Sequence, residues 1–214
     1  MTHYHSFTFF AVEEHTYLLW DDTGEACAVD AGMYYDSEKK LFDDFLSEHN
    51  LRLVRSIHTH LHFDHYMGAH WIKETYGVEA EAPLIDIEDK IPLCGPFVKA
   101  HSEIFRIVMQ SEFRPLPEAG KSVMFGNTFL RILSVPGHTP GHVAFYEPAS
   151  GFVLCGDVLF KGDIGRTDLW RGDYRRLLES IHRELFTLPD DTVVLPGHGP
   201  ETDIGTEKAG FRYS

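Results

Sequence analysis

Short apolar runs rich in aromatic and β-branched residues recur along the first quarter of the chain. These runs span residues 7–12, 16–20, 26–29 and 51–57. Residues 21–24 supply turn chemistry between the second and third runs, so the opening segment is predicted to be an antiparallel meander that a fourth strand follows. Apolar side chains within 41–46 share one face at helical spacing. They predict a helix that begins at a Ser37 N-cap and ends near Asn50.

The second part of the chain repeats this order of strands and helices. A helix is expected from Met67 to Gly77, then a strand over 78–82, and the segment 91–117 is interpreted as an insertion that carries a helix. Further strands are predicted at 122–125, 128–135, 142–146, 151–154 and 192–195, with an amphipathic helix at 173–185. Two β-rich halves that each lead into helices predict an α/β fold, in which two sheets pack face to face between helices as a four-layer αβ/βα sandwich.

Length and charge narrow the classes of function. The 214 residues suit a single domain, 1–214, with a sizeable core. The formal net charge of −14 argues against a nucleic-acid partner, because such affinity depends on Lys and Arg. No signal peptide and no apolar stretch of the ~18 residues that span a membrane is evident, so a cytoplasmic protein is expected. The oligomeric state is left open.

The most distinctive chemistry lies in the sequence I-H-T-H-L-H-F-D-H, which follows the predicted strand 51–57. This stretch contains His58, His60, His62, Asp64 and His65. Imidazoles this close repel one another when protonated, whereas a divalent metal takes neutral imidazole and carboxylate as ligands. His60 and His62 point the same way on an extended segment, while Asp64 and His65 can face a second position. The spacing suggests two metals; the alternative is a solvated loop that is rich in histidine.

Three further candidates stand where predicted strands end. His138 lies in the turn P-G-H-T-P-G-H, Asp157 follows the strand 151–154, and His198 lies in P-G-H-G-P. Turns with this much Pro and Gly can hold one side chain in a fixed place, and a carboxylate after a buried strand is costly unless paired or metal-bound. His142 is interpreted as a supporting or packing residue rather than a ligand. Each feature alone is weak, because such turns are common.

Together these residues carry a resemblance to a known family. The order H-x-H-x-D-H, then G-H, G-D and P-G-H resembles the metallo-β-lactamase fold superfamily over nearly the whole chain. The resemblance implies that His60, His62 and His138 hold one metal, that Asp64, His65 and His198 hold another, and that Asp157 bridges them. Zinc is the expected metal, with iron and manganese as alternatives.

Within the superfamily, G-R-T-D at 165–168 and the P-G-H-G-P turn are similar to the glyoxalase II (hydroxyacylglutathione hydrolase) group and to the closely related persulfide dioxygenases. Only sixteen residues follow His198, so the chain resembles short bacterial members that lack a C-terminal helical region for glutathione. Two divalent ions would lower the pKa of a shared water towards ~7. Such a nucleophile suits a small-molecule thioester, whose thiolate leaves readily. Asp64 and Asp157 are the predicted catalytic residues.

The main alternative is an oxygenase. His60, His138 and Asp157 alone would form a two-histidine, one-carboxylate face for a single Fe(II), as in the persulfide dioxygenases that are related to glyoxalase II. Metal content and oxygen uptake discriminate between the two functions. A third alternative is a binding or scaffold protein on the same fold.

The remaining candidates have supporting roles. Arg166 is expected either to form a buried pair with Asp168 that braces the loop after Asp157, or to bind a substrate carboxylate. Asp30 and His58 are expected to orient metal-binding imidazoles through the other ring nitrogen. His101 is interpreted as an ordinary helix residue, and Cys155 as part of the core.

Overall fold

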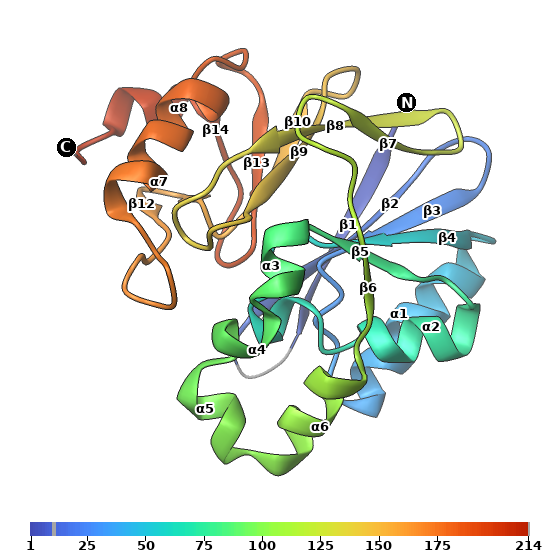
Figure 1. The fold of residues 1–214 in the computed structure, drawn as a ribbon. Coiled ribbons are helices and arrows are strands. Elements are labelled where there is room, and N and C mark those ends of the chain that lie inside the picture. Colours follow the sequence, from blue (N-terminus) through green and yellow to red (C-terminus); the bar gives the residue numbers. More distant parts are fainter. Residues whose placement is uncertain (10–11, 214) are drawn as a thin grey trace.

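Two six-stranded sheets form the centre of the part of the chain that the computed structural model describes, residues 1–9 and 12–213 (Figure 1). The first sheet has the order β1 (His3–Phe9), β2 (Glu14–Trp20), β3 (Glu25–Val29), β4 (Arg52–Ile57), β5 (Ala80–Ala82) and β6 (Phe113–Pro115). The second has the order β14 (Thr202–Asp203), β13 (Val193–Pro196), β10 (Phe152–Gly156), β9 (Val143–Glu147), β8 (Thr128–Ser134) and β7 (Ser122–Phe125). The end of the predicted strand 7–12 includes residues 10 and 11, which lie outside the described residues.

The central strands β2, β3, β9 and β10 are buried on both faces, because helices and the other sheet cover them. On β2, Tyr17 and Leu19 pack between the two sheets, while Leu18 points to the helices outside. On β10, Leu154 faces the first sheet and Cys155 faces the opposite way, into the outer core. The predicted four-layer sandwich and the core position of Cys155 are therefore confirmed.

Helices cover the outer faces (Figure 1). The helices α1 (Asp36–Glu48) and α2 (Ala69–Tyr76) bury Phe42, Leu46 and Ile72 against the first sheet. The second sheet is covered by α7 (Tyr174–Ser180), which continues as a π-helical turn (Ile181–Leu185), and by α8 (Ile204–Gly210).

The predicted Ser37 N-cap is wrong by two residues. The N-cap of α1 is Tyr35, and the Glu38 carboxylate accepts from the backbone N–H groups of Tyr34 and Tyr35 at 2.8 and 2.9 Å. This glutamate supplies acceptors to N–H groups at the start of the helix, so a serine at the cap is not required.

The segment 91–117 differs most from its prediction. It contains not one helix but three short ones, α4 (Lys90–Leu93), α5 (Gly95–Ala100) and α6 (Ser102–Gln110), and the unpredicted helix α3 (Leu84–Glu88) precedes them. Gly95, with φ +65°, is the first residue of α5 and follows the end of α4 at Leu93 by two positions. The segment then ends in β6, which pairs in parallel with β5 as the edge strand of the first sheet. Its last residues are therefore part of the sheet rather than of an insertion.

A small hairpin was also not predicted. The strands β11 (Leu159–Phe160) and β12 (Asp163–Ile164) pair with each other directly after β10. Among the described residues, none of the helices is both long and apolar enough to cross a membrane.

Candidate metal centre

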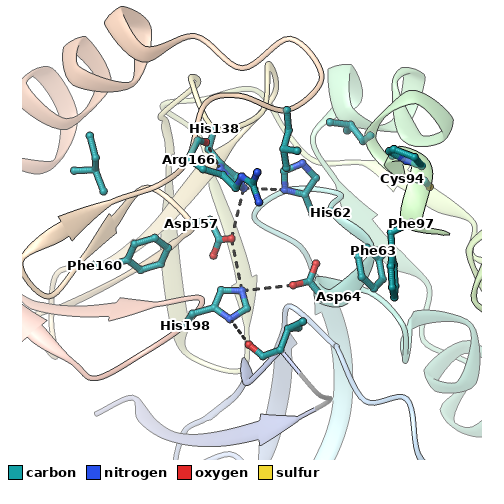
Figure 2. Close-up of a pocket in the computed structure, with 16 residues that line it drawn as sticks. His62, Phe63, Asp64, Cys94, Phe97, His138, Asp157, Phe160, Arg166 and His198 are labelled. Atoms are coloured by element: carbon teal, nitrogen blue, oxygen red, sulfur yellow. Dashed lines mark hydrogen bonds and ion pairs between the residues drawn. The ribbon is translucent and has the colours of Figure 1, made fainter.

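The polar residues singled out in the sequence follow strands that end at one side of the sandwich. His58 to His65 follow β4 and pass through a 3₁₀ turn (Phe63–His65), and His138 lies between β8 and β9. Asp157 and His198 follow β10 and β13, which are parallel neighbours. Figure 2 shows His62, Asp64, His138, Asp157 and His198 turned toward a common point. The name His–Asp cluster is used below for His60, His62, Asp64, His65, His138, Asp157 and His198.

One half of the His–Asp cluster consists of three imidazoles. Possible ligand atoms of His60, His62 and His138 all lie within 4.8 Å of one another. His62 Nδ1 is 2.8 Å from His138 Nε2, and the two rings are perpendicular. All three residues are buried. Three ring nitrogens aimed at one point are the donor set that a divalent metal of the zinc type takes.

The other half contains Asp64, His65 and His198, whose possible ligand atoms also lie within 4.8 Å of one another. Asp157 stands between the halves. Its Oδ1 is 3.5 Å from His65 Nε2, and its Oδ2 is 3.5 Å from His138 Nε2 and 3.6 Å from His198 Nε2. This carboxylate therefore reaches both groups, as a bridging ligand must.

Hydrogen bonds to Nδ1 fix how the rings are turned. His138 Nδ1–H donates to the Arg166 carbonyl at 2.7 Å, and His198 Nδ1–H donates to the Val12 carbonyl at 3.1 Å. His65 Nδ1–H donates to Asp30 Oδ2 at 3.2 Å. His60 Nδ1–H donates to the Thr59 hydroxyl at 3.0 Å. With Nδ1 engaged in this way, each of these rings directs Nε2 into the cluster.

Protonation within the cluster suits a cation. Burial lowers the pKa of His60 well below its usual value and that of His62 to about 3, so both rings are neutral at pH 7. Burial alone would raise the pKa of Asp157, but the His65 charge outweighs it and lowers that pKa. Neutral imidazoles at His60 and His62 and an ionised Asp157 are the states that metal binding requires. Burial alone would lower the pKa of His65, but the charges of Asp157 and Asp64 outweigh it and raise that pKa, so a metal would displace the proton of His65.

Several polar atoms of the cluster have no hydrogen-bond partner. Within the described residues, His60 Nε2, His65 Nε2 and Asp157 Oδ1 are buried without a hydrogen bond. Leaving such atoms unpaired is costly, and a metal ion satisfies them together. The residues therefore fit two divalent ions.

Asp30 orients a ring of the cluster as the sequence predicted, whereas the role predicted for His58 is wrong, because His58 bonds to a backbone carbonyl and not to a ring. Asp30 Oδ1 and Oδ2 accept from the Thr59 N–H and hydroxyl, both at 2.7 Å, and Oδ2 also accepts from His65. His58 Nδ1–H donates to the His65 carbonyl at 3.0 Å. Asp30 orients the His65 ring directly, whereas His58 braces the His65 backbone.

His142 also supports the cluster from behind. Its ring stacks on His60 at 4.5 Å between centroids, and its Nε2 accepts from the Asp157 N–H at 3.2 Å. Its Nε2 is thus engaged by the backbone, as expected for a supporting residue.

Two turn glycines permit the close approach of these residues. A Cβ at Gly197 would lie 2.2 Å from Asp157 Oδ1 and 2.7 Å from His65 Cε1. Gly137 has φ +142°, and a Cβ there would meet the Leu177 backbone at 2.4 Å. The Gly-His pairs in both turns are therefore steric requirements, because any side chain before His138 or His198 would displace its neighbours.

Arg166 and Asp168 do form the expected pair. Nε and Nη2 donate to the two carboxylate oxygens, each at 2.7 Å. The prediction of a buried pair is wrong, since the side chains are 61% and 68% exposed. The pair lies in the loop that follows the hairpin β11–β12, outside the layers of the sandwich, so water reaches both side chains. His101 lies outside the cluster, where its Nδ1–H donates to the Phe97 carbonyl at 2.7 Å.

Sequence reasoning missed Asp86. This buried residue of α3 accepts from the Leu61 N–H at 3.2 Å, the Thr139 hydroxyl at 2.7 Å and the Gly141 N–H at 2.8 Å. It therefore ties the loop of His60 and His62 to the turn of His138. In the sequence it appears as one acid within L-I-D-I-E, and only the three-dimensional contacts distinguish it from a surface charge.

Comparison with known proteins agrees with this geometry. The family model for the metallo-beta-lactamase superfamily matches residues 11–198. The hydroxyacylglutathione hydrolase GloC of Haemophilus influenzae is 34% identical over 201 residues, which cover 92% of this chain and 91% of that protein.

Solved structures share the fold over nearly the full length. The BLEG-1 B3 metallo-beta-lactamase has a TM-score of 0.83 at 28% identity and covers 97% of both chains. TTHA1623 in a di-iron-bound form has a TM-score of 0.75 at 32% identity and covers 95% of this chain and 96% of its own. ETHE1 from Myxococcus xanthus has a TM-score of 0.77 at 25% identity and covers 98% of this chain and 84% of its own.

The fold and the His–Asp cluster define a metallo-hydrolase class of protein. The chain belongs to the metallo-β-lactamase superfamily. Membership implies that divalent metals bind at the His-rich groups described above.

Proposed function

We propose that the protein is a binuclear metal-dependent hydrolase that cleaves thioesters of small hydroxyacyl groups, as glyoxalase II does. The observation that carries this proposal is the position of Asp157 between two ligand groups, within 3.5 to 3.6 Å of His65, His138 and His198. The 34% identity to GloC supports the thioester class. Zinc is the proposed metal, and the di-iron form of TTHA1623 makes iron the first alternative to test.

The roles of the residues follow from their contacts. His60, His62 and His138 would hold one ion, Asp64, His65 and His198 the other, and Asp157 both. Together the ions would supply Lewis-acid activation of water and of the substrate carbonyl. Asp64 and Asp157 supply the negative charge of the site, and Asp157 sets the separation of the two groups. A thiolate leaves without a proton donor, so a separate acid is not required.

Thiol release from S-D-lactoylglutathione tests the proposal. The protein is loaded in turn with zinc, iron and manganese, and release is followed with a thiol-reactive dye. Asp157→Ala should lower kcat/KM by about a hundredfold or more, because both ligand groups lose a shared anchor. His49→Ala is the matched control, since His49 is exposed at the end of α1 and lies outside the cluster. Equal activity of Asp157→Ala and the parent protein would show that Asp157 is not needed as a shared ligand of the two groups.

A mononuclear Fe(II) persulfide dioxygenase remains the second candidate, and the likeness to ETHE1 is the observation that favours it. That chemistry would use only His60, His138 and Asp157, whereas the identity of this chain to GloC is 34% and its identity to ETHE1 is 25%. We therefore favour the hydrolase. Oxygen consumption with glutathione persulfide and iron, without thiol release from any thioester, would reverse this choice.

A β-lactam is tested separately, with ring opening followed by absorbance because its hydrolysis releases no thiol, since the BLEG-1 lactamase shares the fold over 97% of the chain. We further propose a single domain, a small-molecule substrate and a location in the cytoplasm. The acidic net charge of −14 supports the exclusion of nucleic acid as a substrate.

A further inference from the structure

A cavity of about 570 Å³ opens beside the His–Asp cluster. His62, Asp64, His138, Asp157 and His198 form its polar floor. The walls away from this floor are apolar and are formed by Leu93, Pro96, Phe97, Phe160, Ile164 and Leu169. In Figure 2, Phe97 and Phe160 lie on opposite sides of the cluster. A bound molecule that reaches the cluster must therefore extend its other parts along apolar side chains.

Phe97 is the most exposed aromatic of these walls. Its side chain is 51% exposed, yet its ring lies 4.2 Å from that of His101 and 5.6 Å from that of Phe63. The bond from His101 Nδ1–H to the Phe97 carbonyl fixes the same turn of chain. The ring is therefore held as a wall of the cavity, where a ligand can remove it from water.

The cavity offers little to a charged ligand arm. Among the described residues that line it, Arg166 has the only Lys or Arg side chain. Its guanidinium is already engaged by both oxygens of Asp168. Glutathione carries two carboxylates and one ammonium group, and burial of such charges without partners is unfavourable. An uncharged apolar arm meets no such cost.

We propose that the cavity selects thioesters with an apolar arm, aliphatic or aromatic, and that α4 and α5 form the wall that binds this arm. The proposal rests on the thioesterase function proposed above and specifies its substrate class. The apolar arm can belong to the acyl group or to the thiol, and the experiments separate these two sources.

The first experiment measures binding without turnover. Affinities of the metal-loaded protein for the N-acetylcysteamine thioethers with S-methyl and S-hexyl groups are compared by titration calorimetry. Each added methylene should tighten binding about twofold, less than for full burial because the wall is open on one side. Phe97→Ala should weaken hexyl binding by about tenfold and leave methyl binding unchanged. Equal affinity for the methyl and hexyl thioethers would overturn the proposal.

Phe129→Ala is the matched control for Phe97→Ala. Phe129 is 52% exposed on β8 and does not line the cavity, so its replacement should leave hexyl binding unchanged. An equal loss in both variants would show that α5 is not the wall.

The second experiment measures kcat/KM in two series. In one series the thiol is N-acetylcysteamine and the acyl group lengthens from acetyl to hexanoyl; in the other the acyl group is acetyl and the S-alkyl arm lengthens. The series with the rising kcat/KM identifies the arm that lies on the wall. Hydrolysis that is independent of chain length in both series refutes the cavity proposal but not the hydrolase. Tight hexyl binding without cleavage of any thioester refutes the hydrolase but not the cavity assignment.

Discussion

Asp86 shows how much one buried carboxylate contributes to the arrangement of a metal centre. It accepts from Leu61, Thr139 and Gly141, and so joins the chain on either side of His60 and His138 without touching either ring. Burial raises the pKa of Asp86 from 3.8 to about 6, although the three donors favour its charged form. Its ionisation at neutral pH therefore opposes folding, while its hydrogen bonds favour it.

We predict that Asp86→Ala lowers the free energy of unfolding by about 3 kcal/mol, because three donors in the interior lose their acceptor. The loss should also depend on pH. A raised folded-state pKa contributes stability that is complete below 3.8 and disappears as pH rises through about 6. The difference in free energy of unfolding between the parent protein and the variant should therefore be ~1 kcal/mol larger at about pH 5 than at about pH 7.5.

Urea unfolding of both proteins at the two pH values, under the same metal conditions, measures this difference. The other titrating groups are common to the pair and cancel to first order. Asp191→Ala removes an exposed carboxylate and should show no such difference. A pH-independent gap between the parent protein and Asp86→Ala would mean that Asp86 stays ionised throughout.

At the scale of elements, ends of strands decide where the chemistry lies. Asp157 and His198 come close because β10 and β13 are parallel neighbours that end at the same edge. His62 and His138 come from different sheets, and their ring nitrogens lie 2.8 Å apart. The site is therefore built from both halves of the sandwich.

These strand ends could be predicted from the sequence because their signals are local. Apolar runs predict the strands, and Pro-Gly turns mark where His138 and His198 follow them. The alternation at His60 and His62 needs no tertiary information either. The four layers could be predicted as well, since central strands that are apolar on both faces must be covered on both sides.

The remaining elements could not be predicted because they depend on distant partners. Strand β6 spans only Phe113–Pro115 and exists through pairing with β5, about thirty residues earlier. The helices α4 and α5 are too short for a periodic signal, and the turn between them depends on the conformation of Gly95. Asp86 becomes distinctive only when three segments meet.

Gly95 gives a prediction at this scale. It holds φ +65° at the start of α5, and a Cβ there would meet no atom within 4 Å. Gly95→Ala should therefore lower the free energy of unfolding by about 1 kcal/mol through backbone strain alone.

Gly210→Ala is the control, because that site at the end of α8 is equally open and its φ is not in the left-handed region. It should be neutral or stabilising by about 0.5 kcal/mol, as measured by thermal unfolding. Equal effects at the two sites would exclude strain as the cause.

At the scale of the whole molecule, the His–Asp cluster connects the two sheets. The first half of the chain provides His60, His62, Asp64 and His65, and the second half provides His138, Asp157 and His198. Ions bound between them would act as cross-links that favour the folded state, because the unfolded chain does not hold these ligands together. Metal content and thermal stability should therefore change together.

We predict that the metal-loaded protein binds two equivalents per chain and that a chelator lowers its Tm in two steps. At an ion concentration about a hundredfold above Kd, each ion adds about 2.7 kcal/mol to the free energy of unfolding. For a chain of this size, that corresponds to a Tm shift of about 5–10 °C per ion. His198→Ala should retain one equivalent and one Tm step, because His198 belongs only to the group with Asp64 and His65. His101→Ala should retain both. Elemental analysis and calorimetric scans of the same samples provide the measurement. A parent protein that saturates at one equivalent, with His198→Ala unchanged in Tm and metal content, would exclude the binuclear centre and leave the mononuclear alternative.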